Sequence, residues 1–506
     1  MTQWIAKRFA AAGRATPRPW LAVLAGCALL VLAARQLPGV ASSASAQEYD
    51  LVILNGRVID PESHLDAVRH LGIAGGKIQA ISRKPLRGRT ALDARGLSVA
   101  PGFIDLHAHG QDEENYRFYA MDGVTTALEL EVGTADVDAW YAERKGKALV
   151  HYGVSVGHIP VRMRVMDDPG TFLPTGDAAT RAATEAEIKA MKEHIASGLQ
   201  RGAVAVGFGV AYTAAAVRWE ILEMFRVAAR YGASAHVHVR GGESGVRGVE
   251  EVIAAAAITG APLHIVHVNS SGARATPRLL QMIGEAQARG LDVTTECYPY
   301  TAGMTLIESA LFDQGWQEQY QGRLQWVESG EWLTPESFAR YRKSGGMVII
   351  HTNPEEVVQG AVASPLTLIA SDGFLENGKG HPRTAGTYAR VLGRYVRAAK
   401  VLTWMDALRK MTLLPARRLE RWVPMMKNKG RIRVGADADL TIFDPERVRD
   451  QATYQEPAKF SQGIQYVLVR GVLVVKDGKL QEGVAPGRPL RAPIPSEPHR
   501  GPAAPA

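Results

Sequence analysis

The chain has 506 residues, of which 46% are hydrophobic and 22% charged, so it holds ample apolar material for a large folded core. Its formal net charge is +8, but the first 46 residues hold five Lys and Arg and no Asp or Glu, which leaves only +3 for the rest. This near balance excludes the strongly basic surface on which nucleic-acid binding depends.

An export signal is predicted at residues 1–46. Basic residues precede an apolar stretch at 20–34, and small residues at 44–46 form a cleavage site before Gln47. We therefore expect an exported, periplasmic protein without stable membrane association after cleavage. There are two alternatives. Cys27 ends a lipobox-like Leu-Ala-Gly-Cys and would carry the lipid of a lipoprotein, or the stretch stays as an anchor, although it is shorter than the roughly 20 residues of a membrane span.

Short strands and turns are predicted at both ends of the mature chain. Glycine-containing turns separate short apolar runs in residues 47–100, and the same pattern returns in residues 426–483. We predict one small β-domain built from both segments. Residues 484–506 are rich in Pro, Ala and Arg and are expected to form a disordered tail. After signal cleavage Cys297 is the single cysteine, so no internal disulfide is expected.

Strands and helices alternate in residues 101–425. Eight strands followed by helices predict a closed parallel (β/α)8 barrel. Residues 301–346 break the rhythm after the seventh strand and contain three tryptophans, so we expect an insertion there, and the strand-like run 347–351 is expected to belong to this insertion or to its exit. The eight strand candidates are residues 103–107, 124–131, 151–158, 203–209, 233–239, 263–268, 293–298 and 366–371.

The most informative motif is Pro-Gly-Phe-Ile-Asp-Leu-His-Ala-His at residues 101–109. Side chains alternate across a strand, so His107 and His109 share one face, and two imidazoles that converge on one point favour a transition metal. Functional groups of such barrels lie at the carboxyl ends of the strands. The further candidates at strand ends are Glu129, Glu131, His158, His236, His238, His264, His267 and Asp372.

The chain resembles the N-acyl-D-amino-acid deacylases (D-aminoacylases) of the metal-dependent amidohydrolase superfamily. The resemblance covers residues 49–483 and implies a (β/α)8 barrel beside a small β-sandwich made by both termini. Besides residues 101–109, it rests on Gly-Val-Thr-Thr (123–126), His-Val-Arg (238–240), His-Ile-Val-His (264–267), Tyr-Pro-Tyr-Thr-Ala-Gly-Met-Thr (298–305), Ser-Asp-Gly (371–373), His-Pro-Arg (381–383) and Gly-Ala-Asp-Ala-Asp-Leu (435–440).

The resemblance also implies roles for individual residues. His107 and His109 would hold one metal position, and His238 and His267 the other. Asp372 would be the general base and a further metal ligand. The expected cofactor is one Zn²⁺, with two divalent ions as the alternative. Tyr298 is expected to bind substrate by resemblance, and Arg383 because a guanidinium matches a carboxylate.

The chain departs from the family at two positions. The family's second strand supplies a shared cysteine ligand, but here Val132 stands at that position and Glu131 precedes it. We expect Glu131 to replace the thiolate, with Glu129 as its rival. A carboxylate is a harder ligand, so the metal preference stays open. The family's lysine after the sixth-strand histidine is replaced by Asn269, which leaves the substrate class open.

These features predict an exported metalloamidase. Its substrate would be a small N-acyl amino acid, expected to be of D configuration, which is cleaved to a carboxylate and a free amino acid. Metal-activated water would attack while Asp372 acts as base and then acid. Alternatives are a hydantoinase-like cyclic amidase or isoaspartyl-dipeptidase-like enzyme, although no bridging lysine stands in residues 128–132, and a non-catalytic exported metal- or solute-binding protein. Side-chain preference, acyl length and oligomeric state stay open.

Overall fold

The computed structural model describes residues 48–241, 245–313 and 315–494. The predicted signal peptide, its cleavage site and the alternative lipidation site Cys27 lie outside these residues. Within the described ranges, no helix has both the length and the apolar character needed to cross a membrane.

Eight parallel strands form a barrel in the order β6-β7-β8-β9-β10-β11-β12-β16. They are β6 (Phe103–Asp105), β7 (Val124–Thr134), β8 (His151–Gly157), β9 (Val206–Gly209), β10 (Ala235–His238), β11 (Leu263–Ile265), β12 (Val293–Cys297) and β16 (Thr367–Ile369). Just beyond the ends of β6 and β16, the Asp372 amide donates to the His107 carbonyl at 2.7 Å, and Ala108 pairs with Gly373. The predicted (β/α)8 barrel is therefore confirmed.

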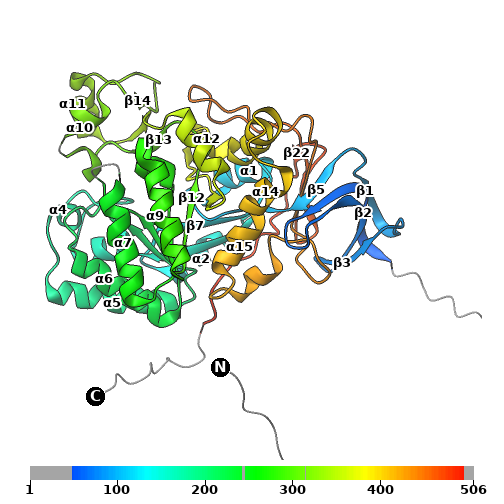
Figure 1. Cartoon of the computed structure of the whole chain (residues 1–506), viewed down its shortest axis with the longest axis horizontal. Coiled ribbons are helices and arrows are strands. Elements are labelled where there is room, and N and C mark those ends of the chain that lie inside the picture. The colour runs from blue at the N-terminus through cyan, green and yellow to red at the C-terminus, as the bar shows by residue number, and fades with distance from the viewer. Residues whose placement is uncertain (1–47, 242–244, 314, 495–506) are drawn as a thin grey trace, which may run out of the picture. The chain divides into compact units, whose positions relative to one another are not determined.

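Helices between the strands cover the outside of the barrel. They are α1 (Glu113–Met121), α2 (Val137–Arg144), α3 (His158–Val165), α4 (Asp177–Thr180), α5 (Glu185–Gln200), α6 (Arg218–Tyr231), α7 (Val246–Thr259), α8 (Val268–Gly272), α9 (Thr276–Ala288), α12 (Glu355–Ala363), α13 (Arg383–Arg390), α14 (Trp404–Leu408) and α15 (Leu414–Leu419). Figure 1 shows α5, α6, α7 and α9 side by side on one flank. Local sequence sets their ends: α5 starts at a capping box between Thr184 and Glu187, and α6 stops at Gly232, whose φ is 68°.

A nine-stranded sheet packs beside the barrel and is built from both flanks of the chain (Figure 1). Its strands are β1 (Tyr49–Asp60), β2 (Leu65–Ala74), β3 (Lys77–Ser82), β4 (Gly88–Asp93), β5 (Ser98–Pro101), β19 (Leu440–Phe443), β20 (Ile464–Val469), β21 (Val472–Lys476) and β22 (Lys479–Leu480). β5 joins the two flanks, because it pairs with β1 on one edge and with β19 on the other. The Ile78 amide donates to the Ala436 carbonyl at 3.0 Å, so the sheet folds back around its own apolar core.

The segment after the seventh barrel strand forms a small unit of its own. Strands β13 (Gly303–Leu306), β15 (Met347–Ile350) and β14 (Leu324–Trp326) make an antiparallel sheet in that order, with α10 (Trp316–Tyr320) and α11 (Pro335–Ser344) beside it. Its core is aromatic: the rings of Trp316 and Phe338 stack at 3.8 Å, and those of Trp326 and Tyr341 at 4.2 Å. After β16, the short strands β17 (Leu375–Glu376) and β18 (Lys379–Gly380) form a hairpin.

The structure corrects one prediction, the disordered tail at residues 484–506. Residues 487–492 lie along β8, where the Leu490 amide donates to the Tyr152 carbonyl at 2.8 Å and the Tyr141 hydroxyl donates to the Leu490 carbonyl at 2.5 Å. Leu490 is fully buried. The composition of this segment suggested disorder, but its backbone finds hydrogen-bond partners on barrel strand β8. Residues 495–506 lie outside the described residues.

Candidate metal centre

The carboxyl ends of the barrel strands bring the predicted site residues together. Beneath them, the carboxylate of Asp105 accepts the amides of His107 at 3.0 Å and Ser371 at 3.1 Å, which holds the first and eighth strand ends together. His267 and Asp372 have positive φ angles of 30° and 54°. Such backbone costs free energy in residues other than glycine and is typical of side chains held in place for function.

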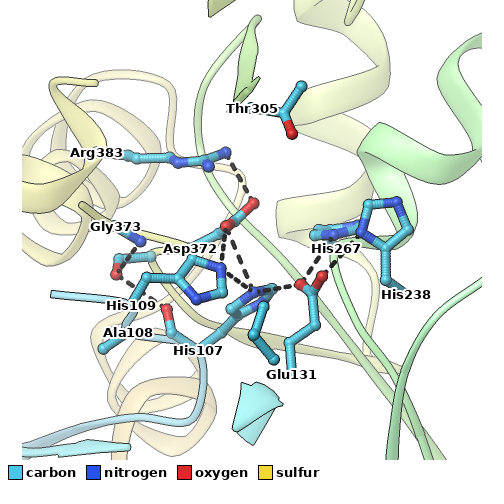
Figure 2. A network of polar contacts seen from close by, with 12 residues as sticks. His107, Ala108, His109, Glu131, His238, His267, Thr305, Asp372, Gly373 and Arg383 are labelled. Atoms are coloured by element: carbon cyan, nitrogen blue, oxygen red, sulfur yellow. Dashed lines mark hydrogen bonds and ion pairs between the residues drawn. The ribbon is translucent and has the colours of Figure 1, made fainter. Parts of the chain in front are cut away.

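A first group of possible ligands comprises His107, His109, Glu131 and Asp372. The Nε2 atoms of His107 and His109 face each other at 3.1 Å. A Glu131 oxygen lies 2.6 Å from Nε2 of His107, and an Asp372 oxygen lies 3.2 Å from Nε2 of His109 (Figure 2). Imidazole nitrogens and carboxylate oxygens that point at one place form the donor set of a divalent metal.

A second group comprises Glu131, His238 and His267. One Glu131 oxygen lies 3.0 Å from Nδ1 of His238, and the other lies 3.6 Å from Nε2 of His267. Figure 2 shows Glu131 between His107 on one side and His238 and His267 on the other. Glu131 therefore belongs to both groups, and three ligands in the second group leave a position for water, as catalytic zinc sites do. The residues fit one or two Zn²⁺ ions.

Two further carboxylates hold the histidines of the first group from behind. Nδ1 of His107 lies 2.7 Å from Glu296, and Nδ1 of His109 lies 2.7 Å from Glu129. Carboxylates in this position fix the ring and raise the basicity of the nitrogen that faces the metal. Glu129, the rival of Glu131, is thus outside both ligand groups. Sequence reasoning missed Glu296, although an acidic residue at the end of the seventh strand was a signal for it.

The other histidines at strand ends have different partners. Nε2 of His264 lies 2.9 Å from Glu296, so His264 supports the carboxylate that holds His107. His236 contacts the Ser234 hydroxyl at 3.0 Å. His158 pairs with Glu220 at 2.7 Å, away from both groups. The structure therefore brings His238 and His267 together, as expected, places His264 in a supporting position, and leaves His158 and His236 outside both groups.

Buried charges dominate the electrostatics of the centre. Burial raises the pKa of Asp372, but the charges of Arg383 and His107 outweigh it and hold this pKa well below its usual range. Burial lowers the pKa of His109, yet the carboxylates of Glu129 and Asp372 raise it to about 10. Protons therefore occupy positions that a metal cation would take, because the centre holds more carboxylates than fixed cations.

A cavity of about 960 Å³ opens above the centre and includes both predicted substrate-binding residues. Arg383 is 1% exposed, and its Nη1 atom lies 2.9 Å from Asp372. Its Nε atom has no hydrogen-bond acceptor among the described residues. The guanidinium lies 4.7 Å from the ring centre of Tyr298. Arg383 thus keeps donors for an anionic ligand beside the centre.

Comparisons with known proteins agree with this geometry. The amidohydrolase family profile matches residues 163–475. An N-acyl-D-glutamate deacylase from Alcaligenes xylosoxydans xylosoxydans is 31% identical over 88% of this chain and 97% of its own length. A solved N-acyl-D-glutamate deacylase from Bordetella bronchiseptica, complexed with zinc and a phosphonate mimic of the tetrahedral intermediate, is 30% identical with a TM-score of 0.77, over 88% of this chain and all of its own.

A solved D-aminoacylase, described for its binuclear metal centre, is 27% identical with a TM-score of 0.76 and the same coverage of this chain. The chain therefore belongs to the amidohydrolase family, in the deacylase group that its motifs indicated.

Proposed function

We propose that this protein is a metal-dependent amidase that hydrolyses N-acyl-D-amino acids to a carboxylate and a free D-amino acid. The observation that carries the proposal is the position of Glu131 between the two histidine pairs, with Asp372 and Arg383 at the same cavity. Two of the relatives named above are N-acyl-D-glutamate deacylases, and one of them was solved with a phosphonate inhibitor that mimics the tetrahedral intermediate.

The metal ligands would be His107, His109 and Asp372 on one side, His238 and His267 on the other, and Glu131 between them. A divalent ion in such a centre lowers the pKa of bound water and polarises the amide carbonyl. The chain's own contribution is to hold these ligands in a buried place and to keep their geometry fixed through Asp105, Glu129 and Glu296.

Asp372 would move the proton. One carboxylate oxygen faces His109 and the other faces Arg383, so the group lies between the ligands and the cavity. It would take a proton from the attacking water and deliver it to the departing amine. Arg383, whose Nε atom has no acceptor among the described residues, and Tyr298, which lines the cavity, would hold the substrate carboxylate.

We also propose export to the periplasm, as residues 1–46 suggest by their basic start, apolar stretch and small-residue end.

The test is a metal-analysed preparation of the mature chain assayed with paired N-acetyl-D- and N-acetyl-L-amino acids, and with hydantoins as cyclic amides. We expect turnover of the linear D substrates. Asp372→Asn should lose activity by at least about 1,000-fold while metal remains bound at Glu131, His238 and His267. Undiminished activity in this variant, or turnover of cyclic amides alone, would contradict the proposal.

A further inference from the structure

The cationic side chains that line the cavity limit how many carboxylates a bound substrate can have. Four arginines and no lysine line it, among the residues that the structure describes. Of these four arginines, Arg383 is the one that is buried, and the proposed function assigns it to the substrate's α-carboxylate. A substrate with an acidic side chain brings a second carboxylate, which needs a second cation.

The other three arginines do not meet that need. Glu251 holds Arg240 at 3.0 and 3.2 Å, and two backbone carbonyls accept hydrogen bonds from its Nη1 and Nη2 atoms. Arg274 is 81% exposed and lies 3.4 Å from Glu356. Arg323 lies in the solvent, one residue before β14.

The position at which the family resemblance implied a lysine is also without charge. Asn269 is fully buried, and its amide nitrogen donates to the Tyr298 carbonyl at 3.1 Å. Three carboxylates without an ion pair among the described residues, Glu308, Glu318 and Glu376, line the cavity as well. These three carboxylates repel an acidic substrate side chain. Because none of them is buried, water screens them, and they offer little attraction to a basic substrate side chain.

The insertion offers an apolar surface instead. Leu306 of β13 lies directly opposite Met347 of β15, and Met304 shares their face because side chains alternate along the strand. All three line the cavity and are partly exposed. Phe172, with its ring edge against His109 at 5.6 Å, is 42% exposed and adds to this surface. Flexible Met and Leu side chains adapt to apolar groups of different shapes.

We infer that the amino-acid side chain of the substrate is uncharged and apolar and packs against Met304, Leu306 and Met347. The inference rests on the proposed function and goes beyond it. It also differs from simple transfer of the specificity named for the N-acyl-D-glutamate deacylase relatives, because the described residues that line the cavity include no second buried cation.

The experiment compares kcat/KM of the zinc-loaded mature protein for N-acetyl derivatives of D-leucine, D-methionine, D-glutamate and D-lysine. We expect the leucine and methionine derivatives to exceed the other two by at least about 100-fold, since an unpaired charge is costly to desolvate. A glutamate or lysine derivative that reacts as well as the leucine derivative would overturn this inference alone. No turnover of any N-acyl amino acid would overturn the proposed function, and the inference with it.

Two variants with the same added charge sharpen the test. Leu306→Arg places a cation on the apolar face and should raise the glutamate-to-leucine ratio at least about tenfold. Gln317→Arg adds a cation at an exposed position of α10 that does not line the cavity and should leave the ratio unchanged. If Leu306→Arg does not fold, Met304→Arg tests the same face. An equal ratio in both variants would show that this face does not meet the side chain.

Discussion

The two histidine pairs of the metal centre are supported in different ways. Behind His107 and His109 stand carboxylates, each 2.7 Å from Nδ1. Among the described residues, the hydrogen-bond partner behind His267 is the Ser271 hydroxyl at 3.3 Å, and the ring of His238 packs against the Tyr212 ring at 4.8 Å. The first pair therefore depends on buried charge and the second on packing, so loss of an outer residue should affect the two groups unequally.

Glu131→Gln should have the largest effect, because Glu131 is the one ligand that both groups share. Loss of its charge leaves Asp372 as the carboxylate of the first group and two imidazoles as the second group. We therefore expect metal affinity to fall by more than about 100-fold, which exceeds the effect of losing an outer residue. Competition with a chromophoric chelator measures it. Two tightly bound ions per chain in this variant would remove Glu131 from its bridging role.

Glu296→Gln should weaken metal binding by about 10- to 100-fold, through the first group alone. The substitution keeps the volume but loses the charge that fixes His107, and it also leaves His264 without its carboxylate. Metal titration monitored with Co²⁺ in place of Zn²⁺ would report the loss. If Ser271→Ala weakens binding equally, the contrast between the two groups is wrong.

Metal affinity should rise with pH. In the metal-free protein the proton on His109 persists up to a pKa of about 10, so over the range from pH 6 to 9 a metal ion must displace it. Each displaced proton changes affinity by roughly tenfold per pH unit. Glu129→Gln removes the charge that contributes most to this elevated pKa and should flatten the dependence. Proton release during calorimetric titration in two buffers is the measurement, and its absence would contradict the assignment.

Ser271→Ala should have the smallest effect, at most a few-fold in metal affinity, because a long hydrogen bond between neutral groups contributes little. Chelator competition at fixed pH is sufficient to measure it. A large loss would mean that the second group also needs its outer partner.

Much of this architecture could be predicted from the sequence. Apolar strands that end in a histidine or an acidic residue predicted the barrel and the strand ends that carry the candidate site residues. Counting from Gly-Val-Thr-Thr favoured Glu131 over Glu129. Side-chain alternation predicted opposite faces for His264 and His267, but β11 ends at Ile265, and His264 contacts Glu296 while His267 lies beside Glu131. These signals are local, since they depend on the period of a single strand.

The rest depends on contacts between distant strands. Glu296 reaches His107 across the barrel interior, and strand periodicity alone does not give that pairing. The attachment of Leu490 beside Tyr152 was hidden by a composition typical of disorder. The pairing of Arg240 with Glu251, which bears on specificity, likewise follows from tertiary contacts alone.

Asp105 accepts hydrogen bonds from the amides of both His107 and Ser371, and this has a consequence for biosynthesis. The ribosome makes residues 107 and 372 far apart in time, yet they must touch before four of the ligands are assembled. Ion capture by the first group should therefore be a late event that marks a completed chain. Added metal should protect the finished protein from proteolysis, whereas a fragment that ends before β16 should gain no such protection.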